Sequence, residues 1–170
     1  DAMGGDAGLA ITVPGAVDFL KQQSDVHLIM VGDEAAVRQA LSSAGAPMDR
    51  ITVCHAAQVV EMDEAPQSAL KNKKESSMRI AINQVKEGNA QAAVSAGNTG
   101  ALMATARFVL KTIPGIERPA IAKFLPSDSE HVTLALDLGA NVDCMPEQLV
   151  QFAIIGSELV HEQQARGGRV

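Results

Sequence analysis

The chain has no tryptophan or tyrosine and only four phenylalanines among its 170 residues. Proteins that bind single-stranded nucleic acids stack the bases on aromatic side chains, so a stacking surface is poorly supplied here. A net charge of -6 also argues against a broad nucleic-acid surface, although it is compatible with a local basic patch. We therefore expect no nucleic-acid partner.

Cysteines and long apolar runs are also scarce. Cys54 and Cys144 form no CxxC pair and have no metal-like spacing to the histidines. Those histidines are His27, His55, His131 and His161. We expect two buried or idle thiols in a reducing cytosol, with no metal and no cofactor. No apolar run approaches the ~20 residues of a membrane-spanning helix, and no secretory signal pattern is present.

Strand-like and helical patterns alternate along a chain that is 46% hydrophobic and 20% charged. Strands are expected over 26–31, 51–54, 92–95, 120–124 and 132–138, with an irregular polar excursion over 56–74. Helices are expected to begin at Thr12–Pro14, Asp33, Ser76 or Ser77, Asn98 or Thr99, and Pro146. This alternation predicts a three-layer α/β/α fold with a doubly wound, mostly parallel sheet, in one domain over residues 1–170.

Both ends of the chain suggest a fragment of a longer protein. Asp1 opens directly on a Gly-Gly turn, like the end of a strand whose body precedes it, and the last residues leave a helix. Cutting such a sheet midway exposes apolar faces and an edge, so we expect poor solubility unless the chain dimerises.

The most informative stretch lies between an apolar run that ends at Ser95 and the helical pattern that follows. Gly97 and Gly100 permit positive φ and close approach of a ligand, and Asn98 or Thr99 can cap the helix. A glycine loop between a strand and a helix points free N–H groups at an anion. The loop therefore predicts a phosphate or carboxylate site.

Two more polar loops and a lysine cluster are candidates for the same site. Residues 1–6 and 137–143 follow expected strands, and the carboxyl ends of parallel strands meet at one edge of a sheet. Lys71, Lys73, Lys74 and Arg79 cluster around the serines that begin a helix. The lysines and the N–H groups of that helix start could together receive a dianion. As alternatives, the acidic residues of the two loops lie in tight turns exposed to solvent, and the lysines belong to an ordinary charged surface.

The chain lacks a Walker A motif, a GxGxxG and a GxSxG.

Four motifs in order, at 1–6 (DAMGGD), 73–78 (KKESSM), 94–104 (VSAGNTGALMA) and 137–144 (DLGANVDC), closely resemble the bacterial phosphate acyltransferase family PlsX. Arg118-Pro119-Ala120 and the residues from Pro146 to Ala153 also fit. The likeness covers nearly the whole chain but about the N-terminal half of the family's usual length.

The resemblance implies transfer of a long-chain acyl group from acyl carrier protein to inorganic phosphate. The acyl phosphate product then supplies phospholipid synthesis. It further implies a fold like that of phosphotransacetylases and isocitrate or isopropylmalate dehydrogenases. Family members are homodimers in the cytoplasm, peripherally associated with the inner face of the membrane. Because acyl carrier protein is strongly acidic, docking must use a local basic surface or the other half of the protein.

The resemblance and the chemistry together suggest roles for individual residues. Catalytic candidates are Lys73, Lys74, Asn98 and Asn141. Candidates for binding phosphate or substrate are Asp1, Gly4, Gly5, Asp6, Ser76, Ser77, Ser95, Gly97, Thr99, Gly100, Asp137 and Gly139. The lysines and the loop N–H groups would grip phosphate, while the two asparagines and Thr99 would stabilise the thioester oxyanion. Asp6 and Asp137 are assigned to orienting lysines or loops.

Three other functions remain open. A phosphotransacetylase-like enzyme would use acyl-CoA instead of the carrier thioester. A noncatalytic subunit would keep the fold and bind an acyl or phosphate ligand. A nicotinamide dehydrogenase on a similar sheet is disfavoured because the dinucleotide fingerprint is absent.

Overall fold

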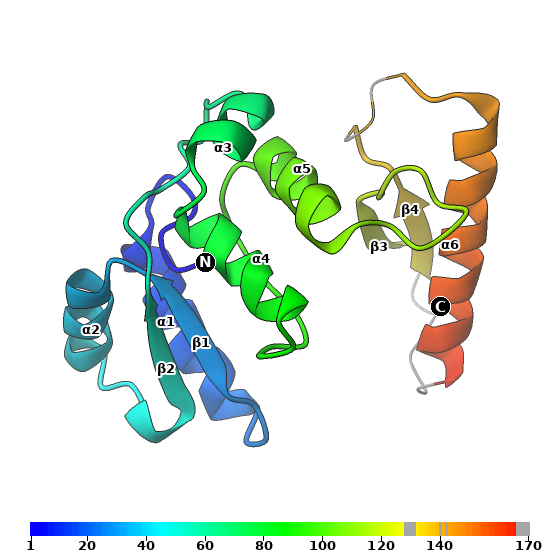
Figure 1. Ribbon diagram of the computed structural model, residues 1–170. Coiled ribbons are helices and arrows are strands. Elements are labelled where there is room, and N and C mark those ends of the chain that lie inside the picture. The colour runs from blue at the N-terminus through cyan, green and yellow to red at the C-terminus, as the bar shows by residue number, and fades with distance from the viewer. Residues whose placement is uncertain (128–131, 140, 142, 166–170) are drawn as a thin grey trace. The chain divides into compact units, whose positions relative to one another are not determined.

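The computed structural model describes residues 1–127, 132–139, 141 and 143–165. Contacts divide the chain into two compact units, residues 1–111 and 112–170, each of which is described by itself (Figure 1). In the described part of the chain, no helix is both long enough and apolar enough to cross a membrane. His131 and the chain beyond Ala165 lie outside the described residues.

The first unit is built from helices around a parallel pair of strands. In chain order its elements are α1 (Leu9–Gln22), β1 (Leu28–Gly32), α2 (Glu34–Ser43), a 3-10 turn η1 (Met48–Arg50), β2 (Ile51–His55), α3 (Pro66–Asn72), α4 (Ser77–Lys86) and α5 (Thr99–Leu110). β1 and β2 pair in parallel from Leu28 opposite Ile51 to Gly32 opposite His55. The expected strands at 26–31 and 51–54 are therefore confirmed.

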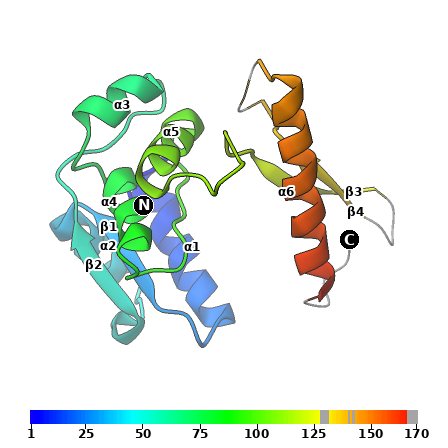
Figure 2. The ribbon, with the colours of Figure 1, turned by 45° about the vertical axis from the view of Figure 1, so that its right-hand side comes forward.

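Helices cover both faces of this strand pair (Figures 1 and 2). On one face Met30 and Ile51 pack with Val13, Leu20 and Leu41 from α1 and α2. On the other face, a second cluster joins β1 to α4 and is built from Val31, Ala56 and Ala81, with Ile29, Cys54 and Ile80 packed against it. Alternate side chains of β1 thus enter different clusters, as expected for a strand buried on both faces. Locally the arrangement is helix, strand pair, helix.

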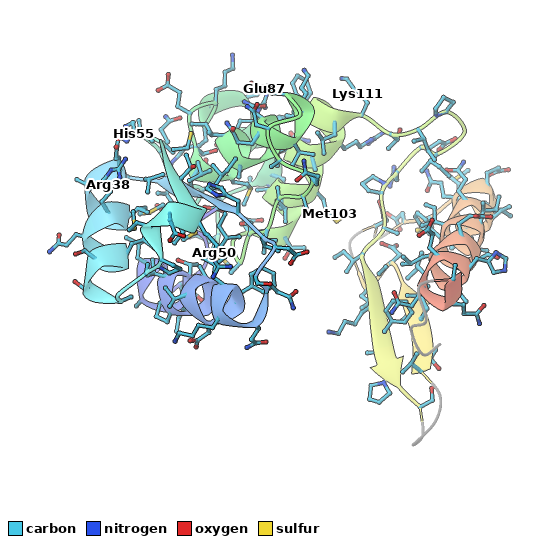
Figure 3. The ribbon with its side chains drawn as sticks, turned by 90° about the horizontal axis from the view of Figure 1, so that it is seen from below. Arg38, Arg50, His55, Glu87, Met103 and Lys111 are labelled. Carbon is cyan, nitrogen blue, oxygen red and sulfur yellow. The ribbon has the colours of Figure 1, made fainter. Side chains whose placement is uncertain are left out.

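Several helix ends follow the expected sequence signals. Asp33 caps α2 by accepting a 2.8 Å hydrogen bond from Ala36 N, and Ser76 accepts one from Arg79 N at α4. Gly45 and Gly88 follow α2 and α4 with φ of 62° and 78°, the left-handed conformation that ends a helix. At α1, Arg50 donates to the carbonyls of Leu20 and Gln23 (Figure 3). These local signals fix where the loops begin.

Three expectations for the first unit are wrong. α1 begins at Leu9, so Pro14 lies inside the helix instead of in its first turn. The expected excursion over 56–74 contains α3. Residues 92–95 form no strand, and Val94 is 81% exposed, because its only backbone partner in the described structure is the nitrogen of Asp1. A strand needs a continuous ladder, which one hydrogen bond does not supply.

The second unit contains β3 (Ala122–Pro126), β4 (Val132–Leu136) and α6 (Pro146–Ala165). Both expected strands are present, and α6 begins at Pro146 as expected. β3 and β4 pair in an antiparallel register, which differs from the expectation of a mostly parallel sheet. The short connection between them favours a hairpin, since parallel neighbours need a long crossover.

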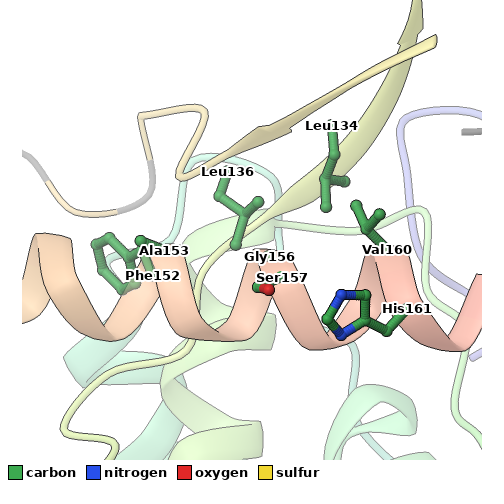
Figure 4. A pocket seen from close by; sticks show the side chains of 8 residues that line it. All are labelled: Leu134, Leu136, Phe152, Ala153, Gly156, Ser157, Val160 and His161. Atoms are coloured by element: carbon green, nitrogen blue, oxygen red, sulfur yellow. The ribbon is translucent and has the colours of Figure 1, made fainter. Parts of the chain in front are cut away.

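An apolar groove of about 420 Å³ opens between β4 and α6 (Figure 4). Leu134, Leu136, Phe152 and Val160 supply most of its apolar lining, and His161 lies at one end. Leu149 is 57% exposed, whereas Gln148 and Phe152 are buried.

Candidate functional site

Two of the predicted loops meet in the first unit through a carboxylate. Ser95 Oγ donates a 2.6 Å hydrogen bond to Asp1 Oδ2, and Gly97 N donates to Ser95 Oγ at 3.1 Å. The other oxygen, Asp1 Oδ1, accepts from Met3 N. The backbone of this segment also bridges its neighbours, since Ala2 N donates to Val31 O at the end of β1. Asp1 therefore ties the first loop to the glycine loop.

Glycine is required where these loops cross. A Cβ on Gly4 would lie 2.8 Å from both Asp1 Oδ2 and Gly97 N, closer than real Cβ atoms approach. A Cβ on Gly97 would lie 3.1 Å from Ser95 Oγ and 3.2 Å from Met78 Cε. Gly5 has a φ of 87° beside Ala96 O. The glycines thus allow the two backbones to touch.

Neither Gly97 nor Gly100 uses the positive φ that glycine permits. Gly100 is instead required by helix packing, because a Cβ there would lie 2.9 Å from Pro66 Cγ of α3. At both positions, the close approach of neighbouring atoms, and not the backbone conformation, explains why the residue is glycine.

The N-terminal end of α5 carries free donors. Asn98 caps the helix through a 3.0 Å hydrogen bond from Ala101 N to its Oδ1. Thr99 and Gly100 are exposed, and in the part of the chain that the structure describes their N–H groups have no hydrogen-bond acceptor. The helix dipole places partial positive charge at the same point. These two amides are the groups of the loop that are available to an anion.

The side-chain amide of Asn98 is not available. Its Nδ2 lies 3.2, 3.0 and 2.8 Å from the carbonyl oxygens of Glu61, Met62 and Glu64. Two amide hydrogens and three carbonyl acceptors leave no donor for a substrate oxygen. Asn98 instead holds the turn before α3 against the start of α5.

Lys73 is engaged in the same turn. Its Nζ donates to Val59 O at 2.9 Å and lies 3.7 Å from Glu64 Oε2. Glu64 Oε1 accepts from Ser68 Oγ, whereas the buried Oε2 has no hydrogen-bond partner. Lys74, by contrast, is exposed. The two neighbouring lysines therefore differ in what they can reach.

The serines at the start of α4 are closed to solvent, at 1% and 0% exposure for Ser76 and Ser77. Ser76 Oγ donates to Lys73 O and caps α4, while Ser77 N donates to Gln58 O. Ser77 Oγ has no hydrogen-bond partner in the described structure. An ion cannot reach either hydroxyl in this structure.

The loop after β4 belongs to the second unit. Asp137, with φ of 59°, accepts from Asn141 N at 3.1 Å and from Asn141 Nδ2 at 2.9 Å. Asn141 Nδ2 also donates to Pro119 O. Gly139 has a φ of 83°. Ala140 and Val142 of the resembling motif lie outside the described residues. The Asp137 carboxylate thus holds both the backbone and the side chain of Asn141.

Cys144 lies against this turn. Its Sγ is 3.5 Å from Asp137 Oδ2 and 3.7 Å from Asn141 O. Partial burial, followed by the hydrogen bond to Asp137 and the charge of that carboxylate, raises the pKa of the Cys144 thiol. Cys144 is therefore a protonated thiol at neutral pH.

The structure brings together Asp1, Gly4, Ser95 and Gly97, and it leaves the exposed Asp6 outside their hydrogen-bond network. Among the described residues, no group of three or more His, Cys, Asp and Glu side chains could hold a metal ion. Sequence reasoning missed Glu64, which lies in the segment expected to be irregular. Glu64 lies two residues before α3, and Pro66 at the first position of that helix was the sequence signal that could have indicated it.

Comparison with known proteins places the chain beside phosphate acyltransferases. The model of a family described as fatty acid synthesis protein matches residues 1–169. A phosphate acyltransferase of Neisseria meningitidis serogroup A is 79% identical over 169 residues, which are 99% of this chain and 48% of the relative. A phosphate acyltransferase of Chromobacterium violaceum is 68% identical over 161 residues, 94% of this chain and 46% of the relative. The chain spans about half the length of the curated relatives it matches.

Proposed function

The chain belongs to the fatty acid synthesis protein family, and from this premise we propose that the protein containing it transfers an acyl group from acyl carrier protein to inorganic phosphate. A phosphate oxygen forms a bond to the thioester carbonyl carbon, and the carbon–sulfur bond breaks. The sulfur leaves as the thiolate of the carrier and takes up, directly or through water, the proton that the attacking hydrogen phosphate loses. The products are acyl phosphate and free carrier protein.

The observation that carries the proposal is the pair of unpartnered N–H groups at Thr99 and Gly100. They lie at the positive end of α5, a helix of 12 residues, directly after the crossing of the two loops. A phosphate dianion accepts hydrogen bonds from such groups at little cost, because no internal bond has to break. Lys74, exposed before α4, adds a mobile positive charge that attracts the ion.

The other predicted residues position this site. Asp1, Ser95 and Gly97 fix the path of the loop into α5. Lys73 and Asn98 hold the turn at 59–64. Their polar atoms are committed to backbone or carboxylate partners, which supports positioning instead of direct contact with the thioester. Preorganised positioning of this kind contributes several kcal/mol to transfer reactions.

We extend the proposal to the protein as a whole. The helix-covered parallel pair supports a doubly wound α/β/α domain that includes both units and continues beyond this chain. The family resemblance supports a cytoplasmic homodimer that associates peripherally with the membrane. Each of these statements is a proposal for the full-length protein.

The direct test incubates the full-length protein with acyl carrier thioester and phosphate and detects the mixed anhydride by mass spectrometry. Acyl-CoA is offered in a parallel reaction. Acyl phosphate from the carrier thioester alone supports the proposal. Product from acyl-CoA alone indicates a phosphotransacetylase-like enzyme, and no product from either thioester contradicts acyl transfer.

A single backbone N–H can be removed to test the phosphate site. Thr99 is the first residue of α5, where proline is tolerated, and Asn98 before it has φ of -55° and ψ of 110°, which suits a residue preceding proline. Thr99→Pro should therefore keep the helix and delete one donor. A charge-assisted hydrogen bond contributes about 1.5–3 kcal/mol, so we expect kcat/KM for phosphate to fall about 10- to 100-fold.

Two variants control this experiment. Thr99→Ala removes the side chain but keeps the N–H, and it should stay close to wild type. Glu34→Pro places proline at the first residue of α2, whose cap Asp33 has φ of -60° and ψ of 114°. It also removes the 3.4 Å hydrogen bond from Glu34 N to His55 Nδ1 and the ion pair with Arg38, so it gives an upper bound on what proline at a helix start costs the fold. An unchanged kcat/KM for phosphate in Thr99→Pro would remove this N–H from the site.

A further inference from the structure

Two cations of the first unit are held on one exposed aromatic ring. The guanidinium carbon of Arg79, from α4, lies 5.1 Å from the centroid of Phe108. Lys111 Nζ, just after the end of α5, lies 4.9 Å from the same centroid. Both distances are within cation–π range. Phe108 is 52% exposed, and Lys111 projects at the end of α5 in Figure 3.

The two helices that carry this ring and its cations contain no acidic residue, although Glu75 and Glu87 lie next to the ends of α4. The segments of α4 and α5, SMRIAINQVK and TGALMATARFVL, contain no aspartate or glutamate, although the whole chain has 20 acidic and 14 basic residues. These helices and the residue after α5 carry Arg79, Lys86, Arg107 and Lys111. Among the described residues, neither Arg79 nor Lys111 forms a salt bridge with a carboxylate. The two cations therefore keep their charge available to a partner.

An exposed aromatic ring flanked by fixed cations has the composition of a protein-binding hot spot. Arginine and aromatic residues are enriched at the centres of interfaces, where the aromatic excludes water from the charged contacts. Because Phe108 already orders both cationic side chains, less conformational entropy is lost when a partner binds. An overall charge of -6 repels acidic proteins, so an acidic partner needs a local surface of this kind.

We propose that Arg79, Phe108 and Lys111, together called the basic aromatic patch, dock an acidic protein. This inference rests on the proposed function, under which that protein is the acyl carrier protein delivering the thioester. An anionic membrane is the other acidic surface. It is favoured less, because membrane adsorption needs a wide apolar face and several basic residues, each contributing about 1 kcal/mol. The patch offers one ring and two held cations.

The test measures binding without turnover in the full-length protein. Fluorescence anisotropy of labelled carrier protein gives the dissociation constant for the wild type, Arg79→Glu, Lys111→Glu and Phe108→Ala. We expect each charge reversal to weaken binding about tenfold or more, and added salt to weaken wild-type binding more than that of the variants. Lys21→Glu is the matched control, since Lys21 is an exposed cation on α1 paired with Asp18.

Steady-state kinetics provide an independent measurement. The same variants should raise KM for the carrier thioester and leave KM for phosphate unchanged. A carrier in which one acidic residue is replaced by lysine should restore binding to Arg79→Glu or Lys111→Glu. Circular dichroism confirms that each variant is folded, and Arg79→Lys supplies a conservative replacement that keeps the charge.

The outcomes separate the docking surface from the function. Wild-type carrier affinity in both charge reversals would overturn the patch, even if acyl phosphate is formed normally. Loss of binding to vesicles of anionic lipid, with carrier binding intact, would assign the patch to a membrane and overturn the proposal. A third outcome would contradict the proposed function alone. In it the wild type binds the carrier but forms no acyl phosphate, and the charge-reversal variants lose carrier binding.

Discussion

At the residue scale, a single carboxamide organises the start of α5. Asn98 Oδ1 caps the helix at Ala101 N, and its Nδ2 contacts the three carbonyls at 61, 62 and 64. The side chain is 9% exposed, so water does not replace these contacts when they are lost. An unpaired buried polar group costs about 1–3 kcal/mol, and a lost cap about 1 kcal/mol.

We therefore expect Asn98→Ala to lower the free energy of unfolding by about 2–4 kcal/mol in the full-length protein, measured by urea denaturation. Asn98→Asp separates the two roles, because its carboxylate keeps the cap but presents oxygens to three carbonyls. It should be at least as destabilising as Asn98→Ala. Wild-type stability in Asn98→Asp would show that the amide does not hold the turn.

Cys144 offers a test of local electrostatics. Burial and Asp137 raise its thiol pKa, so less thiolate is present at pH 7–8 than in an ordinary cysteine. Alkylation by iodoacetamide should be slow at neutral pH and should accelerate as the pH rises through the elevated pKa. Asp137→Asn removes the negative charge, lowers that pKa and should speed alkylation at pH 7.5.

Cys54, a free cysteine of the first unit, is the internal control. Peptide mapping follows both thiols in one sample, and the Cys54 rate should not respond to Asp137→Asn. An unchanged Cys144 rate would show that the carboxylate does not govern this thiol.

The sequence predicted the helix-capping residues better than it predicted the long-range contacts of their side chains. Asp33, Ser76 and Asn98 cap their helices because a short oxygen-bearing side chain bonds two or three residues ahead, which depends on local sequence alone. The acceptors of Asn98 Nδ2 lie 34 to 37 residues away in the sequence. The acceptor of Lys73 Nζ lies 14 residues away. No local pattern contains that information.

At the scale of elements, the crossing of the loops at Gly4 and Gly97 decides how the candidate site is assembled. Gly4→Ala places a methyl group 2.8 Å from Gly97 N and Asp1 Oδ2. One of these neighbours is backbone, so the loops must separate. We expect a loss of about 1–3 kcal/mol in the free energy of unfolding and a clear fall in phosphate affinity.

Gly15→Ala is the matched control for this substitution. Gly15 lies inside α1, and a Cβ there meets nothing within 4 Å. Alanine in a helix interior is favoured over glycine by roughly 0.5–1 kcal/mol, so this variant should be slightly more stable than wild type. Equal effects of the two substitutions in thermal denaturation would contradict the crowding argument.

Helices were more predictable than strand pairing. The strands at 28–32 and 132–136 were indicated by apolar runs, but only the structure shows that one pairs in parallel and the other antiparallel. Burial along α6 does not follow residue polarity either, since Gln148 is buried and Leu149 is exposed. Pairing and burial depend on which surfaces meet, and periodicity does not specify the neighbour.

At the scale of the whole molecule, charge and apolar surface are unevenly distributed. Acidic residues are absent from α4 and α5, whereas α6 presents exposed apolar side chains around its first turns. These are Met145, Leu149, Val150 and Ile154, which are more than half exposed. Clustered exposure of this kind is typical of surfaces that pack against another chain or another part of the same chain.

The 170-residue chain produced alone should therefore self-associate. Burying such side chains yields about 25 cal/mol per Å² of apolar surface, which favours contact between copies. Sedimentation velocity should show species above 17.8 kDa whose proportion rises with concentration. Leu149→Gln with Ile154→Gln should reduce this association, whereas Glu147→Gln with Glu158→Gln, at exposed positions of the same helix, should not. A stable monomer at every concentration would show that this apolar surface is too small to drive association, and the exposed face of α6 would then need no partner.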